Sequence, residues 1–254
     1  QFINVLKNKD LLRLDYGIFI LHLVLTASFI VAPLLIRDAG LLPKDHWMVY
    51  LPVLLTSMAM IIPFVIIAEK KRKMKAVFVG AVATVLVADI GLYFFNDNLW
   101  AIVAGLWVFF CGFNLLEATL PSLISKTAPG NLKGTAMGAY SSSQFMGAFI
   151  GGSFGGWIYG EWGASYVFLF CAIAAGTWLI VALFMNPPQY LANLLVSTEQ
   201  MADEQLSLFM AAALEVKGVA SHILQSSEQV LYLKVDNHLL DKDGLQALIE
   251  KYST

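Results

Sequence analysis

Charged residues are scarce in this 254-residue sequence. Only 13% are Asp, Glu, Lys or Arg, against about 25% in average chains, while 58% are hydrophobic. The few charges are unevenly spread: residues 187–254 hold four Lys/Arg and nine Asp/Glu, and residues 1–186 hold twelve and nine. This composition excludes a water-soluble globule for most of the chain. It predicts a membrane region over 1–186 and a small acidic soluble domain over 187–254.

Cysteine is scarce too, and the patterns typical of enzymes are missing. Cys111 and Cys171 lie in separate apolar runs, and neither has the spacing of a metal ligand. The sequence has no phosphate-binding glycine loop and no pairing of a nucleophile with a base. We therefore expect no enzyme, no metal site and no cofactor.

Long apolar runs are abundant instead. Six of them reach the roughly 20 residues that a membrane-spanning helix needs. They cover residues 16–36, 47–68, 76–95, 99–120, 134–158 and 164–185. The first run is too long for the core of a signal peptide, and Gln1 stands where an initiator Met would. We expect six transmembrane helices that begin partway through a longer protein.

Basic residues in the loops predict the orientation, because Lys and Arg accumulate on the cytoplasmic side. Ten precede the first span or lie in the loops after the second and fourth spans, and the alternate loops hold only Arg37 and Lys44. This bias places both ends of the chain, and the acidic domain, in the cytoplasm.

Two stretches carry a family resemblance. Residues 121–157, "PSLISKTAPGNLKGTAMGAYSSSQFMGAFIGGSFGGW", resemble the tenth-to-eleventh helix region of the major facilitator superfamily, in particular its drug-efflux branch. The loop "AEKKRKMK" at 68–75 is similar to the second copy of that family's acidic-then-basic cytoplasmic signature. The resemblance implies the C-terminal half of a twelve-helix transporter in the bacterial inner membrane, surrounded by lipid and partnered by the N-terminal six-helix half of the same protein.

The same resemblance implies how such a protein works. The two bundles rock around a central cavity, and a small-molecule substrate binds between the repeats near the bilayer midplane. We expect proton-coupled efflux of amphipathic, drug-like compounds. A transporter of sugars or other small solutes, and a membrane-anchored sensor, remain alternatives.

Four charged residues are candidates for gating and charge relay. Glu117 stands one turn before Pro121, and by analogy with the first half it would pair with Arg72 or Lys73 of the basic loop. Such an ion pair must break in each cycle, and a partly solvated pair worth about 1 kcal/mol suits that role. Glu69 ends the second span just ahead of the basic run, where the family's signature acid meets a helix of the opposite bundle.

Polar residues inside the spans are candidates for proton or substrate binding, because ionisable groups in a bilayer are costly. His22 has an ordinary pKa near physiological pH, and Asp15 lies seven residues earlier on a similar face. Asp89 falls in the third span, where we expect a polar contact within the bundle. Tyr140 and Gln144 are available to the cavity. Aromatic residues that could line it are Phe19, Tyr50, Trp107, Phe109, Phe110, Phe113, Tyr140 and Phe145.

Glycines crowd the fifth span, although each interior glycine costs a helix about 1 kcal/mol relative to alanine. Gly147, Gly151 and Gly155 repeat every fourth residue, and Gly152 and Gly156 form a second pair beside them. A helix face bare of side chains lets backbones approach closely in lipid. We expect this face to pack against a helix of its own bundle, of the other bundle, or of a second copy.

The spacing of apolar residues changes after Pro187 and Pro188, where the tail begins. We predict strands at 190–197, 219–225 and 229–235 and helices at 202–214 and 241–252. This β-α-β-β-α order is ferredoxin-like and similar to the heavy-metal-associated domain of copper chaperones, but the loop 197–201 lacks that family's two cysteines. The acidic charge opposes nucleic-acid binding. A regulatory or stabilising role, a dimer contact, and ion or ligand sensing stay open.

Overall fold

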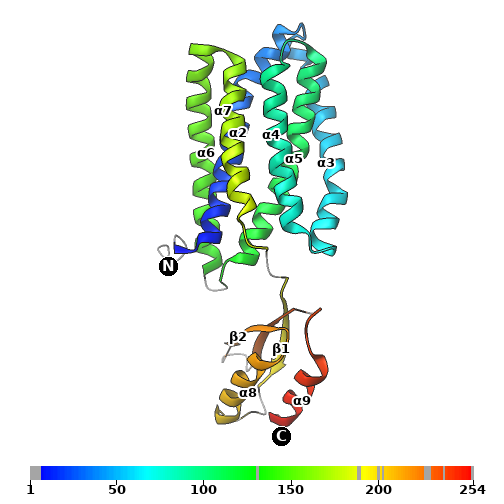
Figure 1. Cartoon of the computed structure of the whole chain (residues 1–254), viewed down its shortest axis with the longest axis vertical. Coiled ribbons are helices and arrows are strands. Elements are labelled where there is room, and N and C mark those ends of the chain that lie inside the picture. The colour runs from blue at the N-terminus through cyan, green and yellow to red at the C-terminus, as the bar shows by residue number, and fades with distance from the viewer. Residues whose placement is uncertain are drawn as a thin grey trace. The chain divides into compact units, whose positions relative to one another are not determined.

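The computed structural model describes residues 7–129, 132–187, 190–198, 201, 203–225, 230–236 and 238–252. The chain divides into two compact units, residues 1–188 and 189–254. The first unit is a bundle of helices, and the second contains a small sheet with helices (Figure 1).

The described part of the first unit forms a bundle of six long helices joined by short turns (Figure 1). Successive helices run in opposite directions, because each turn is too short to carry the chain back across the bundle. The elements are α2 (Lys9–Asp38), η1 (Pro43–Asp45), α3 (Trp47–Lys70), α4 (Met74–Phe94), α5 (Leu99–Thr127), α6 (Lys133–Trp162) and α7 (Ala164–Leu183).

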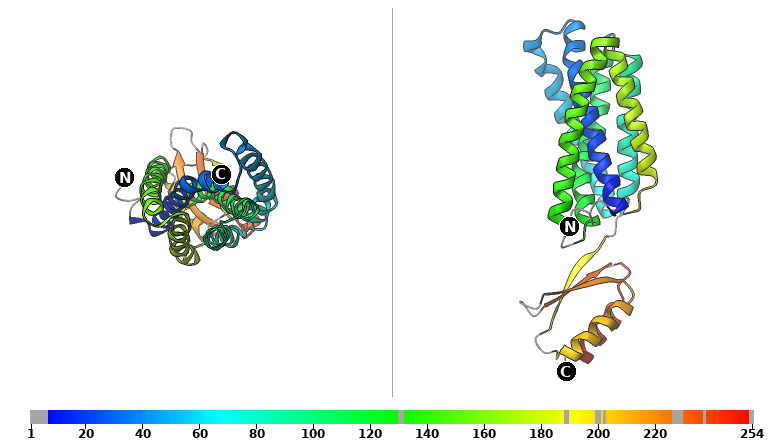
Figure 2. Two further views of the ribbon diagram at one scale, coloured as in Figure 1. Left: turned by 90° about the horizontal axis from the view of Figure 1, so that it is seen from above. Right: turned by 90° about the vertical axis from the view of Figure 1, so that its left-hand side faces the viewer.

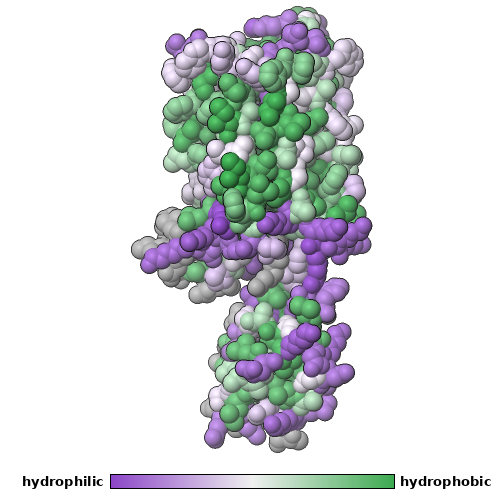
Figure 3. Space-filling model, in the orientation of Figure 1, coloured by the Kyte–Doolittle hydropathy of each residue, from purple (hydrophilic) through white to green (hydrophobic). Residues whose placement is uncertain are grey.

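Each of the six apolar runs matches one of these helices; the runs 76–95 and 164–185 extend slightly past the C-terminal ends of α4 and α7. All but α6 are long and apolar enough to cross a membrane, η1 and α3 counting together as one such segment. Helix α6 is as long as α2, but its glycines and serines lower its hydropathy. Figure 3 shows the apolar residues as a band over the helices, with hydrophilic residues at both ends of the bundle.

Local signals explain where several helices begin and end. The Asn8 side chain accepts hydrogen bonds from the first backbone N–H groups of α2, and Asn98 does the same for α5. Gly163 separates α6 from α7 with a φ of 87°, a conformation that favours glycine. Prolines inside α2, α3 and α5 are tolerated, as they often are in membrane helices.

Helix α2 is the centre of the unit. It runs between α6 and α7 and also contacts α5, and its buried residues cover much of its circumference (Figure 2). Helix α4 packs on α5 and α7. Helix α3 is the least enclosed, with only Val49, Val53, Ser57 and Ala68 buried.

Small residues explain how closely α6 approaches α2. Gly147 lies against the backbone of Phe19, Gly151 against that of Leu23, and Gly155 lies over Ala27. The hydroxyl of Thr26 donates a hydrogen bond to the carbonyl of Ala148, 3.0 Å away on α6. Of the partners left open by the sequence, the structure thus shows a helix of the same bundle.

The second glycine pair does not share this contact. A Cβ at Gly152 would meet nothing within 4 Å, and one at Gly156 would meet only Ile30, at 3.7 Å. These two glycines lie on a neighbouring face of α6, one residue further round the helix.

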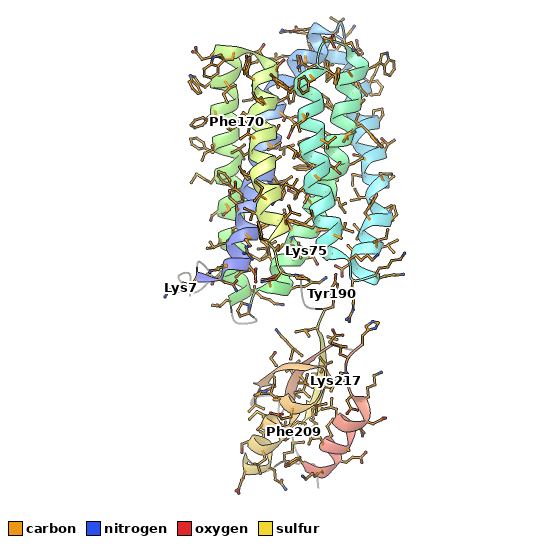
Figure 4. The ribbon with its side chains drawn as sticks, in the orientation of Figure 1. Lys7, Lys75, Phe170, Tyr190, Phe209 and Lys217 are labelled. Atoms are coloured by element: carbon orange, nitrogen blue, oxygen red, sulfur yellow. The ribbon has the colours of Figure 1, made fainter. Side chains whose placement is uncertain are left out.

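The bundle has a basic end. The N-terminal residues Lys7 and Lys9, the α3–α4 turn and the α5–α6 connection all lie there, because the helices alternate in direction. Figure 4 shows Lys7 and Lys75 at this same end. We call it the basic end below.

The described part of the second unit contains a three-stranded antiparallel sheet of order β1-β3-β2 with two helices. Its elements are β1 (Ala192–Ser197), α8 (Asp203–Glu215), β2 (Val219–Gln225), β3 (Val230–Val235) and α9 (Lys242–Tyr252). Residues 199–200 of the predicted cysteine-free loop, and 202 and 229 at the predicted starts of α8 and β3, lie outside the described residues.

The core of this unit lies between one face of the sheet and the helices. Leu231, Leu233 and Val235 alternate along β3 and pack with Phe209 of α8 and Leu245 of α9. The strand order is compatible with the ferredoxin-like arrangement that the sequence predicts.

Candidate functional site

Three polar side chains from three helices meet in the otherwise apolar bundle. His22 of α2 lies between Glu117 of α5 and Gln144 of α6. Its Nε2 atom is 3.3 Å from Oε1 of Glu117 and 2.8 Å from Nε2 of Gln144. The side chains of His22 and Glu117 are 13% and 32% exposed, so the cluster is enclosed but reaches the surface of the bundle.

One nitrogen of His22 therefore faces both a donor and an acceptor. An imidazole without a proton on Nε2 accepts a hydrogen bond from the amide of Gln144. An imidazole that carries a proton there donates it to the carboxylate of Glu117, and the Gln144 amide must then turn over to avoid opposing N–H groups. A proton on Nε2 thus adds a link from α2 to Glu117 of α5 that the unprotonated nitrogen cannot make.

Asp15 and Tyr140 extend the cluster toward the basic end. They are 6% and 4% exposed. Tyr140 lies within electrostatic range of the carboxyl groups of both Asp15 and Glu117. Among the described residues, Oδ1 of Asp15 has no hydrogen-bond partner. The structure thus brings Asp15, His22, Tyr140 and Gln144 together with Glu117. We call these five residues the polar cluster.

The sequence-based pairing of Glu117 was wrong. We expected Arg72 or Lys73, and the structure pairs Glu117 with His22. Glu117 lies nine residues before Lys126 on α5, about 13 Å along the helix from the level of the basic end. Its side chain turns toward α2, whereas Arg72 and Lys73 lie in the turn between α3 and α4.

Glu69 instead makes the ion pair at the basic end. Nζ of Lys126 on α5 lies 2.7 Å from both carboxylate oxygens of Glu69 on α3, and the hydroxyl of Ser122 donates to Oε1 at 3.3 Å. The side chains of Lys126 and Glu69 are 25% and 43% exposed, so water screens the pair. It links two helices of the same half, whereas the sequence suggested a partner in the opposite half.

Asp89 is separate from the polar cluster. It is fully buried on α4, in electrostatic range of Cys171 on α7, whose sulfur lies 3.7 Å from the hydroxyl of Ser28. We expected a polar contact for Asp89, but neither carboxyl oxygen has a hydrogen-bond partner among the described residues. The Cys171 thiol bonds to the Ser28 hydroxyl and to the carbonyl of Val24 instead.

The structure also shows polar links that sequence reasoning missed. The Asn114 amide of α5 donates to the hydroxyl of Ser57 on α3 at 3.0 Å, and the Trp107 indole donates to Thr56 at 3.0 Å. Asn, Ser and Thr inside an apolar run were the available signal, but their partners lie more than 50 residues away in the sequence. Two of the aromatic residues expected in the cavity, Phe109 and Phe110, are buried in the core.

Comparison with known proteins identifies the family of the chain. The family model described as Major Facilitator Superfamily matches residues 7–227. The chain belongs to the major facilitator superfamily. The resemblance predicted from residues 121–157 and the 68–75 loop is thus confirmed, and the apolar helices are multi-pass membrane helices of this family.

The superfamily relatives include a well-matched bacterial protein. The chain is 41% identical to the inner membrane transport protein YajR of Escherichia coli (strain K12) over 253 residues, which cover 99% of this chain and 55% of that protein. It is 32% identical over 151 residues to the uncharacterized transporter BU466 of Buchnera aphidicola subsp. Acyrthosiphon pisum, covering 59% of this chain and 39% of that protein. The chain spans about half the length of these relatives.

Proposed function

We propose that this chain is the C-terminal half of a proton-coupled efflux transporter that exports amphipathic compounds by alternating access. The observation that carries the proposal is the position of His22 between Glu117 and Gln144. Family membership and the relatives named as transporters support transport itself. An N-terminal six-helix half of the same protein would close the cavity that the polar cluster faces.

The polar cluster supplies a way to couple a proton to helix movement. A proton on His22 strengthens the contact of α2 with α5, and its release removes that attraction while the hydrogen bond to Gln144 of α6 remains. Because Gly147, Gly151 and Gly155 bring no side chains of α6 to the contact with α2, few α6 atoms would obstruct a tilt of one helix on the other. A substrate bound beside Tyr140 and Gln144 would compete with either the protonated or the unprotonated arrangement of His22.

The Glu69–Lys126 pair fits a gate at the basic end. It is partly exposed, and pairs of this kind contribute about 0.2–1 kcal/mol, little enough to break in each cycle. Arg72 and Lys73 lie in the adjoining turn, where they could pair with an acidic group on the opposite half.

The loops support a placement of the basic end in the cytoplasm of a bacterial cell, by the positive-inside rule. The acidic second unit follows α7 and would lie on that same side. We propose that it is a ferredoxin-like domain that regulates or stabilises the transporter or joins two copies.

The experiment is dye transport by the full-length protein in vesicles under an imposed proton gradient. We expect export of a fluorescent cationic dye that requires the gradient. His22→Gln should abolish the dependence on the gradient, because glutamine bonds to both neighbours but takes up no proton. His46→Gln is the matched control, since His46 lies outside the polar cluster and bonds to the carbonyl of Leu41.

Three outcomes would contradict parts of the proposal. Unchanged pH dependence in His22→Gln would remove the role of His22. Flux of a sugar in place of the dye would change the substrate class. No flux of either by the wild-type protein would favour a membrane-anchored sensor.

A further inference from the structure

A groove lies between α3, α4 and α5, away from the polar cluster. It has a volume of 510 Å³ and is lined by Ile61, Phe64, Ile67, Val77, Trp107 and Leu115, among others. On α5 the lining residues lie on roughly the opposite side of the helix from Glu117, as the 3.6-residue period requires. The groove is therefore a site distinct from the one proposed to carry the proton.

The walls of the groove are apolar, and the polar groups among them are hydrogen-bonded within the protein. The indole N–H of Trp107 is used by the hydroxyl of Thr56, and the hydroxyl of Thr84 donates to the carbonyl of Gly80 at 2.9 Å. These polar groups already have hydrogen-bond partners within the protein, so a bound molecule need not supply any. A hydrocarbon chain suits such walls, and a polar solute does not.

One end of the groove carries a positive charge. Lys73 is exposed and belongs to the lining, at the turn that leads into α4. In the part of the chain that the structure describes, its ammonium group makes no ion pair or hydrogen bond. Lys70, Lys71, Arg72 and Lys75 surround it in the sequence, so the mouth of the groove lies in the most basic segment of the chain.

We propose that this groove binds an anionic phospholipid, with an acyl chain between α3 and α4 and the phosphate at Lys73. An apolar slot that ends at a cation without a partner among the described residues has the charge pattern of such a lipid, whose tail lies within the bilayer and whose head lies at its edge. The source is the membrane itself, in the leaflet at the basic end. Gly80 and Ala76 are exposed along the slot, so the lipid can enter sideways from the bilayer.

The test uses native mass spectrometry of the full-length protein, released from detergent that contains dioleoyl phosphatidylglycerol or dioleoyl phosphatidylcholine. We expect more molecules of the anionic lipid to be retained. Lys73→Gln should reduce this preference about fivefold, the factor expected for one basic residue near an anionic headgroup. Lys71→Gln is its control: it removes the same charge from an exposed residue that does not line the groove, and should reduce the preference less than twofold.

A second variant tests the slot itself. A side chain at Gly80 would enter open space, because a Cβ there meets nothing within 4 Å, so Gly80→Leu fills the groove without disturbing the helix. It should reduce the retention of both lipids severalfold. Gly176→Leu on α7 is the matched control, since Gly176 has equally open space and lies outside the groove.

Several results would overturn the inference. Equal retention of the two lipids by the wild-type protein would exclude selection by charge. Unchanged retention in both Lys73→Gln and Gly80→Leu would place any bound lipid elsewhere. No retained lipid at all would mean that another part of the full-length protein covers the groove. None of these outcomes bears on dye transport, so the two proposals fail separately.

Discussion

Gly151 of α6 lies so close to the backbone carbonyl of Leu23 on α2 that no methyl group fits between them. Leu23 itself is 4% exposed, and its carbonyl cannot move without disturbing the central helix of the bundle. A glycine at 151 is therefore a condition for the observed contact between α2 and α6.

Adding a methyl group at Gly151 should destabilise the bundle. We expect Gly151→Ala to cost about 1–3 kcal/mol, the usual effect of overpacking, despite the better helix propensity of alanine. Gly152→Ala is the control, because its Cβ would meet nothing within 4 Å and should be neutral or stabilising. Thermal unfolding in detergent measures both. Equal midpoints for the two variants would contradict the close approach.

The Glu69–Lys126 pair should matter more for transport than for stability. Glu69→Gln and Lys126→Gln are each expected to change the free energy of unfolding by less than about 1 kcal/mol, because the pair is partly exposed. Transport rates should change severalfold, and the exchange of both charges, Glu69→Lys with Lys126→Glu, should restore them. If the double variant transports no faster than the single variants, the two residues do not act through their ion pair.

Removing the carboxyl group of Asp89 should stabilise the bundle. Both of its oxygens are buried without a hydrogen-bond partner among the described residues, and such groups cost about 1–3 kcal/mol each. Asp89→Val keeps a similar shape and removes both oxygens. We expect a higher unfolding midpoint for it, and no change for Asp97→Val in the exposed α4–α5 turn. A lower midpoint for Asp89→Val would reveal a partner that the described residues do not include.

The second unit should lose its fold without loss of the first. Phe209 is fully buried in its core, so Phe209→Ala should cost about 3–5 kcal/mol. Its neighbour Leu208 is 53% exposed, and Leu208→Ala should cost less than about 0.5 kcal/mol. Limited proteolysis of the full-length protein is the measurement. We expect cleavage after residue 188 in Phe209→Ala alone, with the helices intact; digestion of both units would contradict their independence.

The glycine repeat and Glu117 show which features could be predicted from the sequence and which could not. The glycine repeat predicted a bare helix face, but α2 as its partner came only from the structure, because the contacting residues of the two helices are more than 100 positions apart in the chain. Glu117 was predicted as a gating candidate that pairs with Arg72 or Lys73, whereas the structure pairs it with His22. Its helical position could be counted along the sequence, whereas the direction it faces depends on how α5 packs.

Hydrophobicity was enough to predict a membrane bundle with six helices, because it is a local and compositional property, and the resemblance of residues 121–157 and of the 68–75 loop to a known family pointed to the superfamily. The tertiary structure alone decided which polar groups meet. His22, Glu117 and Gln144 are far apart in the sequence, and only the packing of α2, α5 and α6 brings their side chains within 3.3 Å. Burial inside a low-dielectric bundle then makes that meeting chemically significant, since few water molecules remain to substitute for any one partner.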